Sequence, residues 1–127
     1  MKIKWITKDD SLGAVTIYEN NIRLNKKAAD YFLDAFAIAI GIDLEDHKIV
    51  IKKVNKDEAE SLGIDKSRLY KINMKPSYGR ITGKKIIDEL KEIYDFDFSK
   101  KLAYKFSAKW NTGEKMLIVN VKEDLYV

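Results

Sequence analysis

Hydrophobic and polar residues alternate along much of the chain, in short segments that are rich in β-branched and aromatic side chains. Such alternation is typical of strands that bury one face and expose the other. The segments with this pattern are residues 2–6, 14–18, 22–24, 37–42, 48–54, 69–74, 80–81, 104–110 and 115–121. Turn-forming residues separate them, at 19–21, 43–47, 75–79 and 111–114, so we predict antiparallel hairpins.

Two other segments, residues 26–36 and 83–94, have a helical period. Their apolar side chains recur at spacings of three and four, which predicts one buried face for each helix. These side chains are Ala28, Ala29, Phe32, Ala35 and Phe36 in the first helix, and Ile86, Ile87, Leu90, Ile93 and Tyr94 in the second. Asn25 and Thr82 precede the two helices and are predicted to cap them.

The order of predicted elements is the same in residues 13–54 and in residues 69–122: strand, turn, short strand, capped helix, hairpin. A polar connection at 55–68 joins them, with room for a short helical turn that would end at Gly63. We therefore predict an α+β fold in which two pseudo-repeats pack into one compact domain, residues 1–127.

The composition agrees with a packed core beneath a charged surface, because 46% of the 127 residues are hydrophobic and 35% are charged. The chain has no cysteine, which excludes disulfides, thiol catalysis and thiolate metal sites. The first ten residues have no apolar stretch of signal-peptide length, and no apolar run is long enough to span a bilayer. These features predict a cytoplasmic protein.

The charge at the two predicted helix starts is unusual. The net charge of the chain is +4, and in each half an arginine, a branched aliphatic residue and a cap residue precede two lysines. Lysines in a first turn oppose the helix dipole, so stability alone would favour acidic residues there. A bound phosphate would offset this repulsion; the alternative is that these lysines extend into solvent without a binding role. The predicted nucleic-acid or anion-binding residues, with Tyr78 beside them, are Arg23, Lys26, Lys27, Tyr78, Arg80, Lys84 and Lys85.

Catalytic patterns are scarce. His47 is the single histidine and lies in a predicted turn, and the acidic residues around it have the pattern of a solvated turn. Neither a phosphate-binding glycine motif nor the ligand spacing of a calcium loop is present. We therefore expect no enzyme activity, no metal and no cofactor. The aromatic side chains of Tyr104, Phe106 and Trp110 share one strand face, which favours a core position over a base-stacking surface.

The segment Gly79-Arg80-Ile81-Thr82, the helix after it and the hairpin through Asn111 resemble the AbrB/SpoVT/MazE swapped-hairpin family of bacterial DNA-binding proteins. Two copies in one chain would resemble the MraZ-type arrangement. In the first copy, Ile22 stands at the position of the family's glycine. The resemblance implies that the arginine-bearing strands contact DNA, through Arg80 and through Arg23.

The expected function is therefore that of a nucleic-acid-binding protein, a DNA-binding transcriptional regulator that contacts backbone phosphates. The alternative is a protein-interaction or structural module with no nucleic-acid or catalytic role. The candidate partners are thus DNA and another protein, and no membrane partner is expected. The sequence leaves the oligomeric state open, with a homodimer among the alternatives.

Overall fold

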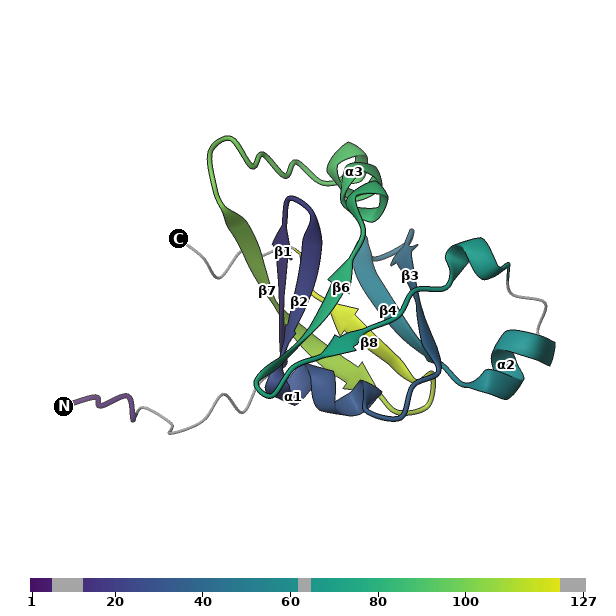
Figure 1. The fold of residues 1–127 in the computed structure, drawn as a ribbon. Helices are drawn as coiled ribbons and strands as arrows, with labels where there is room; N and C mark the ends of the chain where they lie inside the picture. The colour runs from purple at the N-terminus through teal and green to yellow at the C-terminus, as the bar shows by residue number, and fades with distance from the viewer. Residues whose placement is uncertain (6–12, 62–64, 122–127) are drawn as a thin grey trace.

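The protein is described from a computed structural model, which covers residues 1–5, 13–61 and 65–121. Antiparallel strands form an eight-stranded sheet that curls into a half-barrel, with short helices at its ends (Figure 1). The strands are β1 (Gly13–Tyr18), β2 (Asn21–Asn25), β3 (Ala37–Asp43), β4 (Lys48–Val54), β5 (Asn73–Met74), β6 (Tyr78–Thr82), β7 (Ala103–Asn111) and β8 (Met116–Val119). The helices are α1 (Lys26–Ala29), α2 (Lys56–Ser61) and α3 (Lys84–Ile93), with 3₁₀ turns at Asp30–Phe32 and Lys66–Arg68. The predicted α+β fold is confirmed.

The two halves of the chain exchange strands within this sheet, whose order is β3-β4-β8-β7-β1-β2-β6-β5. β1 from the first half pairs with β7 from the second, and the corresponding strands β2 and β6 pair with each other, as do β4 and β8. In these two pairs, Arg23 lies opposite Arg80 and Val50 lies opposite Ile118. Each half therefore depends on the other to complete its sheet.

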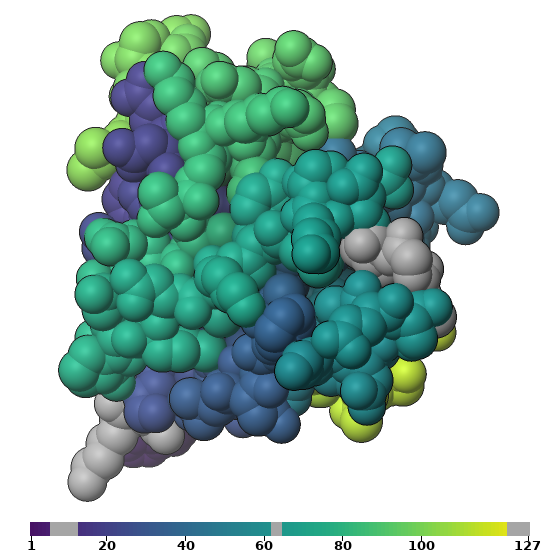
Figure 2. All heavy atoms as spheres, turned by 45° about the vertical axis from the view of Figure 1, so that its right-hand side comes forward, coloured from purple at the N-terminus to yellow at the C-terminus, as the bar shows by residue number. Residues whose placement is uncertain are grey.

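The ends of the sheet are also linked. Ile38 in β3 and Tyr70, in the segment before β5, donate backbone hydrogen bonds to each other, and both N···O distances are 2.9 Å. The same region is held by Lys71, whose Nζ lies 2.6 Å from the carbonyl oxygen of Phe36 and 4.0 Å from the centre of its ring. Figure 2 shows the teal atoms of α2 and of the segment before β5 gathered beside the blue atoms that lead into β3. The connection between the halves thus packs against the first half.

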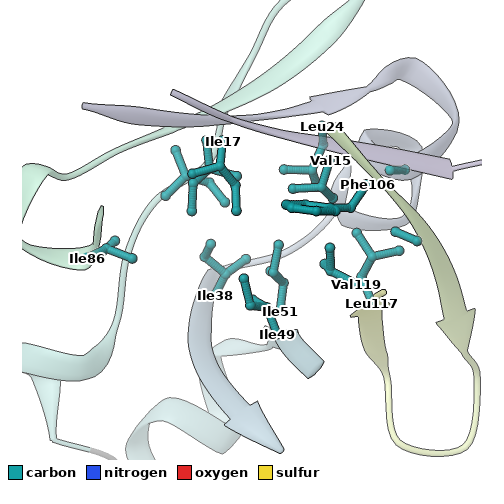
Figure 3. Packing of buried hydrophobic residues seen from close by; sticks show 14 of the residues in the cluster. Val15, Ile17, Leu24, Ile38, Ile49, Ile51, Ile86, Phe106, Leu117 and Val119 are labelled. Carbon is teal, nitrogen blue, oxygen red and sulfur yellow. The ribbon is translucent and has the colours of Figure 1, made fainter. Parts of the chain in front are cut away.

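The core lies inside the curled sheet, where alternate residues of the strands meet (Figure 3). Side chains from both halves interdigitate there, including Val15 and Leu24 from the first half and Phe106, Leu117 and Val119 from the second. Each of these five side chains is at most 2% exposed. Burial of this apolar surface is the main force that holds the halves together.

The helices close the two ends of the half-barrel, α1 at the bottom and α3 at the top of Figure 1. α3 turns Ile86, Ile87 and Leu90 toward the core, as its spacing predicts, whereas Ile93 is 53% exposed. α1 begins at the predicted cap, Asn25, whose Oδ1 accepts a hydrogen bond from the backbone N–H of Ala28 (3.0 Å). The helices are thus anchored by a few buried side chains and one strong cap.

Several predicted boundaries were wrong, and strand pairing explains most of the differences. The helix predicted at 26–36 is α-helical only to Ala29, because one 3₁₀ turn follows and the N–H of Phe36 then donates to Val54 O, where β3 joins β4. Thr82 does not cap α3: it pairs with Asn21 at the end of β6, and Gly83 precedes the helix without a side-chain cap.

Other differences concern the length of strands. Tyr78 and Gly79, predicted in a turn, belong to β6, and the strand predicted at 69–74 is reduced to β5 and the bridge at Tyr70. β8 ends at Val119, and residues 2–5 form no strand. Residue 6 and the predicted helix stop at Gly63 lie outside the described residues.

Gly13 permits a close approach of β1 to β7. A Cβ at this position would lie 2.8 Å from the carbonyl oxygen of Ala108, a backbone atom that cannot move without distorting the sheet. We expect Gly13→Ala to lower the free energy of unfolding by about 1–3 kcal/mol, measured by urea denaturation. Gly41→Ala in β3 is the control, because its Cβ would only reach Val50 Cγ2 at 3.5 Å. Equal losses in the two variants would contradict this account.

Asn25 joins two elements, since its Oδ1 also accepts a hydrogen bond from the N–H of Ala14 (3.1 Å). Asn25→Ala leaves two N–H groups without this acceptor, so we expect a loss of about 2 kcal/mol in the free energy of unfolding. Asn55→Ala removes a comparable but exposed contact, the bond from the N–H of Glu58 at the start of α2 (2.7 Å). In thermal unfolding, the melting temperature of Asn25→Ala should be well below that of Asn55→Ala. The reverse order would disprove that Asn25 stabilises both β1 and α1.

Candidate functional site

Arg23 and Arg80 lie directly opposite each other on the outer surface of the paired strands β2 and β6. The neighbours of Arg23 in its strand, Ile22 and Leu24, are buried, so alternation points the arginine outward. The same holds for Arg80, which stands between Gly79 and Ile81. Directly opposed residues of neighbouring strands have Cβ atoms only about 4.5–5.5 Å apart, and like charges in such pairs repel each other. The fold therefore brings two cations together at a cost to its own stability.

The arginines belong to a polar row that crosses the sheet. Thr16 faces Arg23 from β1 and Lys105 faces Thr16 from β7, while Asn73 faces Arg80 from β5. Residues paired in this way point to the same side of the sheet. The row therefore runs across five strands, in the order Lys105, Thr16, Arg23, Arg80 and Asn73.

Two tyrosines flank Arg23. Its guanidinium carbon lies 4.9 Å from the ring centre of Tyr18 and 5.0 Å from that of Tyr78, distances within the range of cation–π attraction. Tyr78, which the sequence predicted beside the site, is therefore next to an arginine, although it is the arginine of the other half. Tyr18 was missed. Its position two residues from Thr16, on the outward face of a strand, was a signal that an aromatic ring is exposed there.

No carboxylate neutralises the arginines within the described residues. The three ion pairs found there join lysines to Asp30, Asp34 and Asp97. Lys53 donates a hydrogen bond to Asp34 and lowers the pKa of its carboxyl below the ordinary value. Among the described residues, the Nε atoms of Arg23 and Arg80 are buried without a hydrogen-bond partner. Oδ1 of Asn21, in the same strand as Arg23, is buried without a partner as well. The two unneutralised charges favour an external anion, which would meet the terminal Nη groups because the Nε atoms are buried.

The predicted lysine pairs lie elsewhere. Because β2 and β6 are antiparallel and each is followed by its helix, Lys26 and Lys27 fall at one end of the β2–β6 ribbon, and Lys84 and Lys85 at the other. The structure therefore brings the arginines together but separates the lysine pairs.

The surroundings of the lysines differ between the two ends. Nζ of Lys26 lies 3.1 Å from Asp30, and Nζ of Lys27 lies 5.8 Å from the ring centre of Tyr31. The four residues of α1 form a single turn, too short to build the dipole expected from the sequence. Lys84 and Lys85 are exposed in the first turn of the longer α3, which has no acidic residue there. Only the second of the two predicted helix starts thus keeps its basic character unopposed.

The other residues considered for chemistry, His47 and the aromatic residues of β7, do not form a site within the described residues. His47 is exposed in a turn with φ of 55°, and its carbonyl oxygen accepts a hydrogen bond from Tyr94 (2.9 Å). Trp110 stacks on Tyr31, with ring centres 4.7 Å apart, and Phe106 is buried. Within residues 1–5, 13–61 and 65–121, no three histidine or acidic side chains come together as metal ligands. The aromatic side chains of Phe106 and Trp110 belong to the core and its rim.

The described helices include none that is long and apolar enough to cross a membrane. Comparison of the chain with protein-family models, with curated proteins and with solved structures found no match.

Proposed function

We propose that the protein binds DNA through the outer face of the β2–β6 ribbon and acts as a transcriptional regulator. The observation that carries this proposal is the pairing of Arg23 with Arg80 in adjacent strands, without a carboxylate partner among the described residues. A phosphate group can accept hydrogen bonds from both guanidinium groups and remove their repulsion. Such contacts supply most of the affinity of a protein for the DNA backbone.

The size of the face also suits a polyanion. Five residues of β2 and of β6 separate the lysine pairs at the two ends, which corresponds to about 17 Å of strand. Duplex DNA carries a charge for about every 1.7 Å of its axis, so one face of this length meets several phosphates. The lysines would then extend the contact that the arginines begin.

The arrangement of strands supports the same function. Exchange of strands between two similar halves, with the arginine-bearing strands β2 and β6 paired with each other, resembles the swapped-hairpin DNA-binding family named above. In that family the corresponding strands and their flanking loops contact DNA. The proposal carries this role to Arg80, which follows Gly79 as in the family, and to Arg23.

Fluorescence anisotropy with a labelled DNA duplex of mixed sequence tests the proposal. We expect the protein to bind at about 50 mM salt, with log K falling linearly against log salt concentration as counterions are released. Arg68→Ala is the matched control for alanine variants of Arg23 and Arg80. It removes the remaining arginine, which is exposed in the 3₁₀ turn at Lys66–Arg68. Absence of binding at low salt would exclude the proposed function.

One observation favours the alternative, a protein-interaction module. β3 lies at an edge of the sheet, and a groove of about 190 Å³ separates it from α3, lined by Ile40, Ile42, Leu90 and Ile93 among others. Beyond the bridge between Ile38 and Tyr70, an edge of this kind can accept a partner's strand. This function predicts a partner that stays bound at high salt, and that is unaffected by Arg80→Ala.

A further inference from the structure

The two arginines at the centre of the face have unlike surroundings. Arg23 lies between the rings of Tyr18 and Tyr78, at 4.9 and 5.0 Å, whereas no ring or carboxylate of the described residues makes such a contact with Arg80. The strand that faces Arg80 offers Asn73 instead of an aromatic residue. The pairing of β2 with β6 is therefore symmetric in its arginines but not in their neighbours.

Contact with aromatic rings on both sides restricts a guanidinium group. The group is planar and its N–H donors lie in the plane, so two aromatic rings close to its central carbon limit its rotation without accepting its hydrogen bonds. A side chain held in this way loses less conformational entropy when it binds than a free one does. The orientation of Arg23 is therefore restricted in advance, which favours two parallel hydrogen bonds from its terminal Nη groups, since its Nε is buried.

We propose, on the basis of the DNA-binding function above, that the two arginines have different tasks. Arg23, positioned by Tyr18 and Tyr78, donates a bidentate pair of hydrogen bonds to two adjacent acceptor atoms of DNA. Arg80 contributes its charge to the same face. The two acceptors belong either to a phosphate or to the N7 and O6 edge of a guanine, which share this geometry.

Lysine substitution separates the two tasks, because lysine keeps the charge and loses the planar fork. In anisotropy titrations we expect Arg23→Lys to weaken DNA binding on the order of tenfold, and Arg80→Lys to change it by no more than about twofold. Equal losses in the two variants, with wild-type binding intact, would overturn this inference and leave the proposed function standing. Absence of wild-type binding would instead reject the function itself.

The tyrosines are tested as positioning residues. Tyr18→Phe and Tyr78→Phe keep a ring beside Arg23, so both should bind DNA as the wild type does. Tyr18→Leu and Tyr78→Leu should each weaken binding several-fold, and should add little when Arg23 is already lysine, since they act through the same side chain. Losses that are as large in the lysine background as in the wild type would overturn the positioning role.

A modified probe identifies the acceptor. A duplex in which 7-deazaguanine replaces guanine lacks the N7 acceptor but keeps its phosphates. If Arg23 contacts guanine, the difference between the wild type and Arg23→Lys should shrink on this probe; if it contacts phosphate, the difference should persist. Both results support a bidentate contact, whereas a wild type and Arg23→Lys that bind every probe equally would contradict it.

Discussion

The double variant Arg23→Ala/Arg80→Ala is expected to lose measurable DNA binding at physiological salt while it remains folded. Both arginines are half-buried on one outer face, and neither belongs to the hydrophobic core, although their Nε atoms are covered. If both arginines contact phosphates, their removal should make the slope of log K against log salt less negative by about 1.8, because each phosphate contact contributes about −0.9. If Arg23 contacts guanine instead, the change should be about half as large. Anisotropy titrations over a series of salt concentrations measure the slope, and circular dichroism verifies the fold.

The stability of this variant is informative in its own right. Because the two charges face each other without a carboxylate partner among the described residues, their removal relieves a repulsion. We expect a melting temperature equal to or above that of the wild type. A lower one would mean that the arginines serve the fold, and unchanged DNA affinity would mean that the face is not the binding site.

Phe106→Ala is expected to have the largest effect on stability. The ring is 2% exposed in the centre of the core and lies 5.8 Å from the ring of Phe96. Replacement of a buried phenylalanine by alanine costs about 3–5 kcal/mol, which is a large part of the roughly 5–15 kcal/mol that stabilises a typical domain. The midpoint of urea unfolding should therefore fall far below that of the wild type, and much of the protein should be unfolded at 37 °C.

Phe36→Ala is the matched control, since a phenylalanine side chain just before β3 is 41% exposed there. Its loss should be much smaller, though not zero, because Lys71 packs on the ring. A small loss in Phe106→Ala, comparable to that of Phe36→Ala, would contradict the position of the core between the two halves.

The elements that sequence patterns predicted well are those decided by local chemistry. The alternation in β4, the Asn25 cap and the apolar stripe of α3 all depend on residues within a few positions of one another. The tight turn around His47 is of the same kind. Local periodicity, caps and turn residues suffice for such features.

The features that escaped prediction are decided by pairing between distant segments. The first helix ends early because Phe36 bonds to Val54, and Thr82 is drawn into β6 by Asn21. The arginine residues were predicted as candidates, but their direct opposition depends on the register of β2 and β6. The approach of Tyr18 to Arg23 depends on the register of β1 and β2. The local sequence pattern of a single strand does not determine either register.

The central claim, that DNA contacts the outer face of the β2–β6 ribbon, is tested most directly by NMR. The Nε–H signals of Arg23, Arg68 and Arg80 can be followed while a DNA duplex is added to ¹⁵N-labelled protein. We expect the signals of Arg23 and Arg80 to shift together with the backbone amides of β2 and β6, whereas that of Arg68 should stay in place. Shifts confined to Arg68, α2 or the exposed edge of β3 would contradict it.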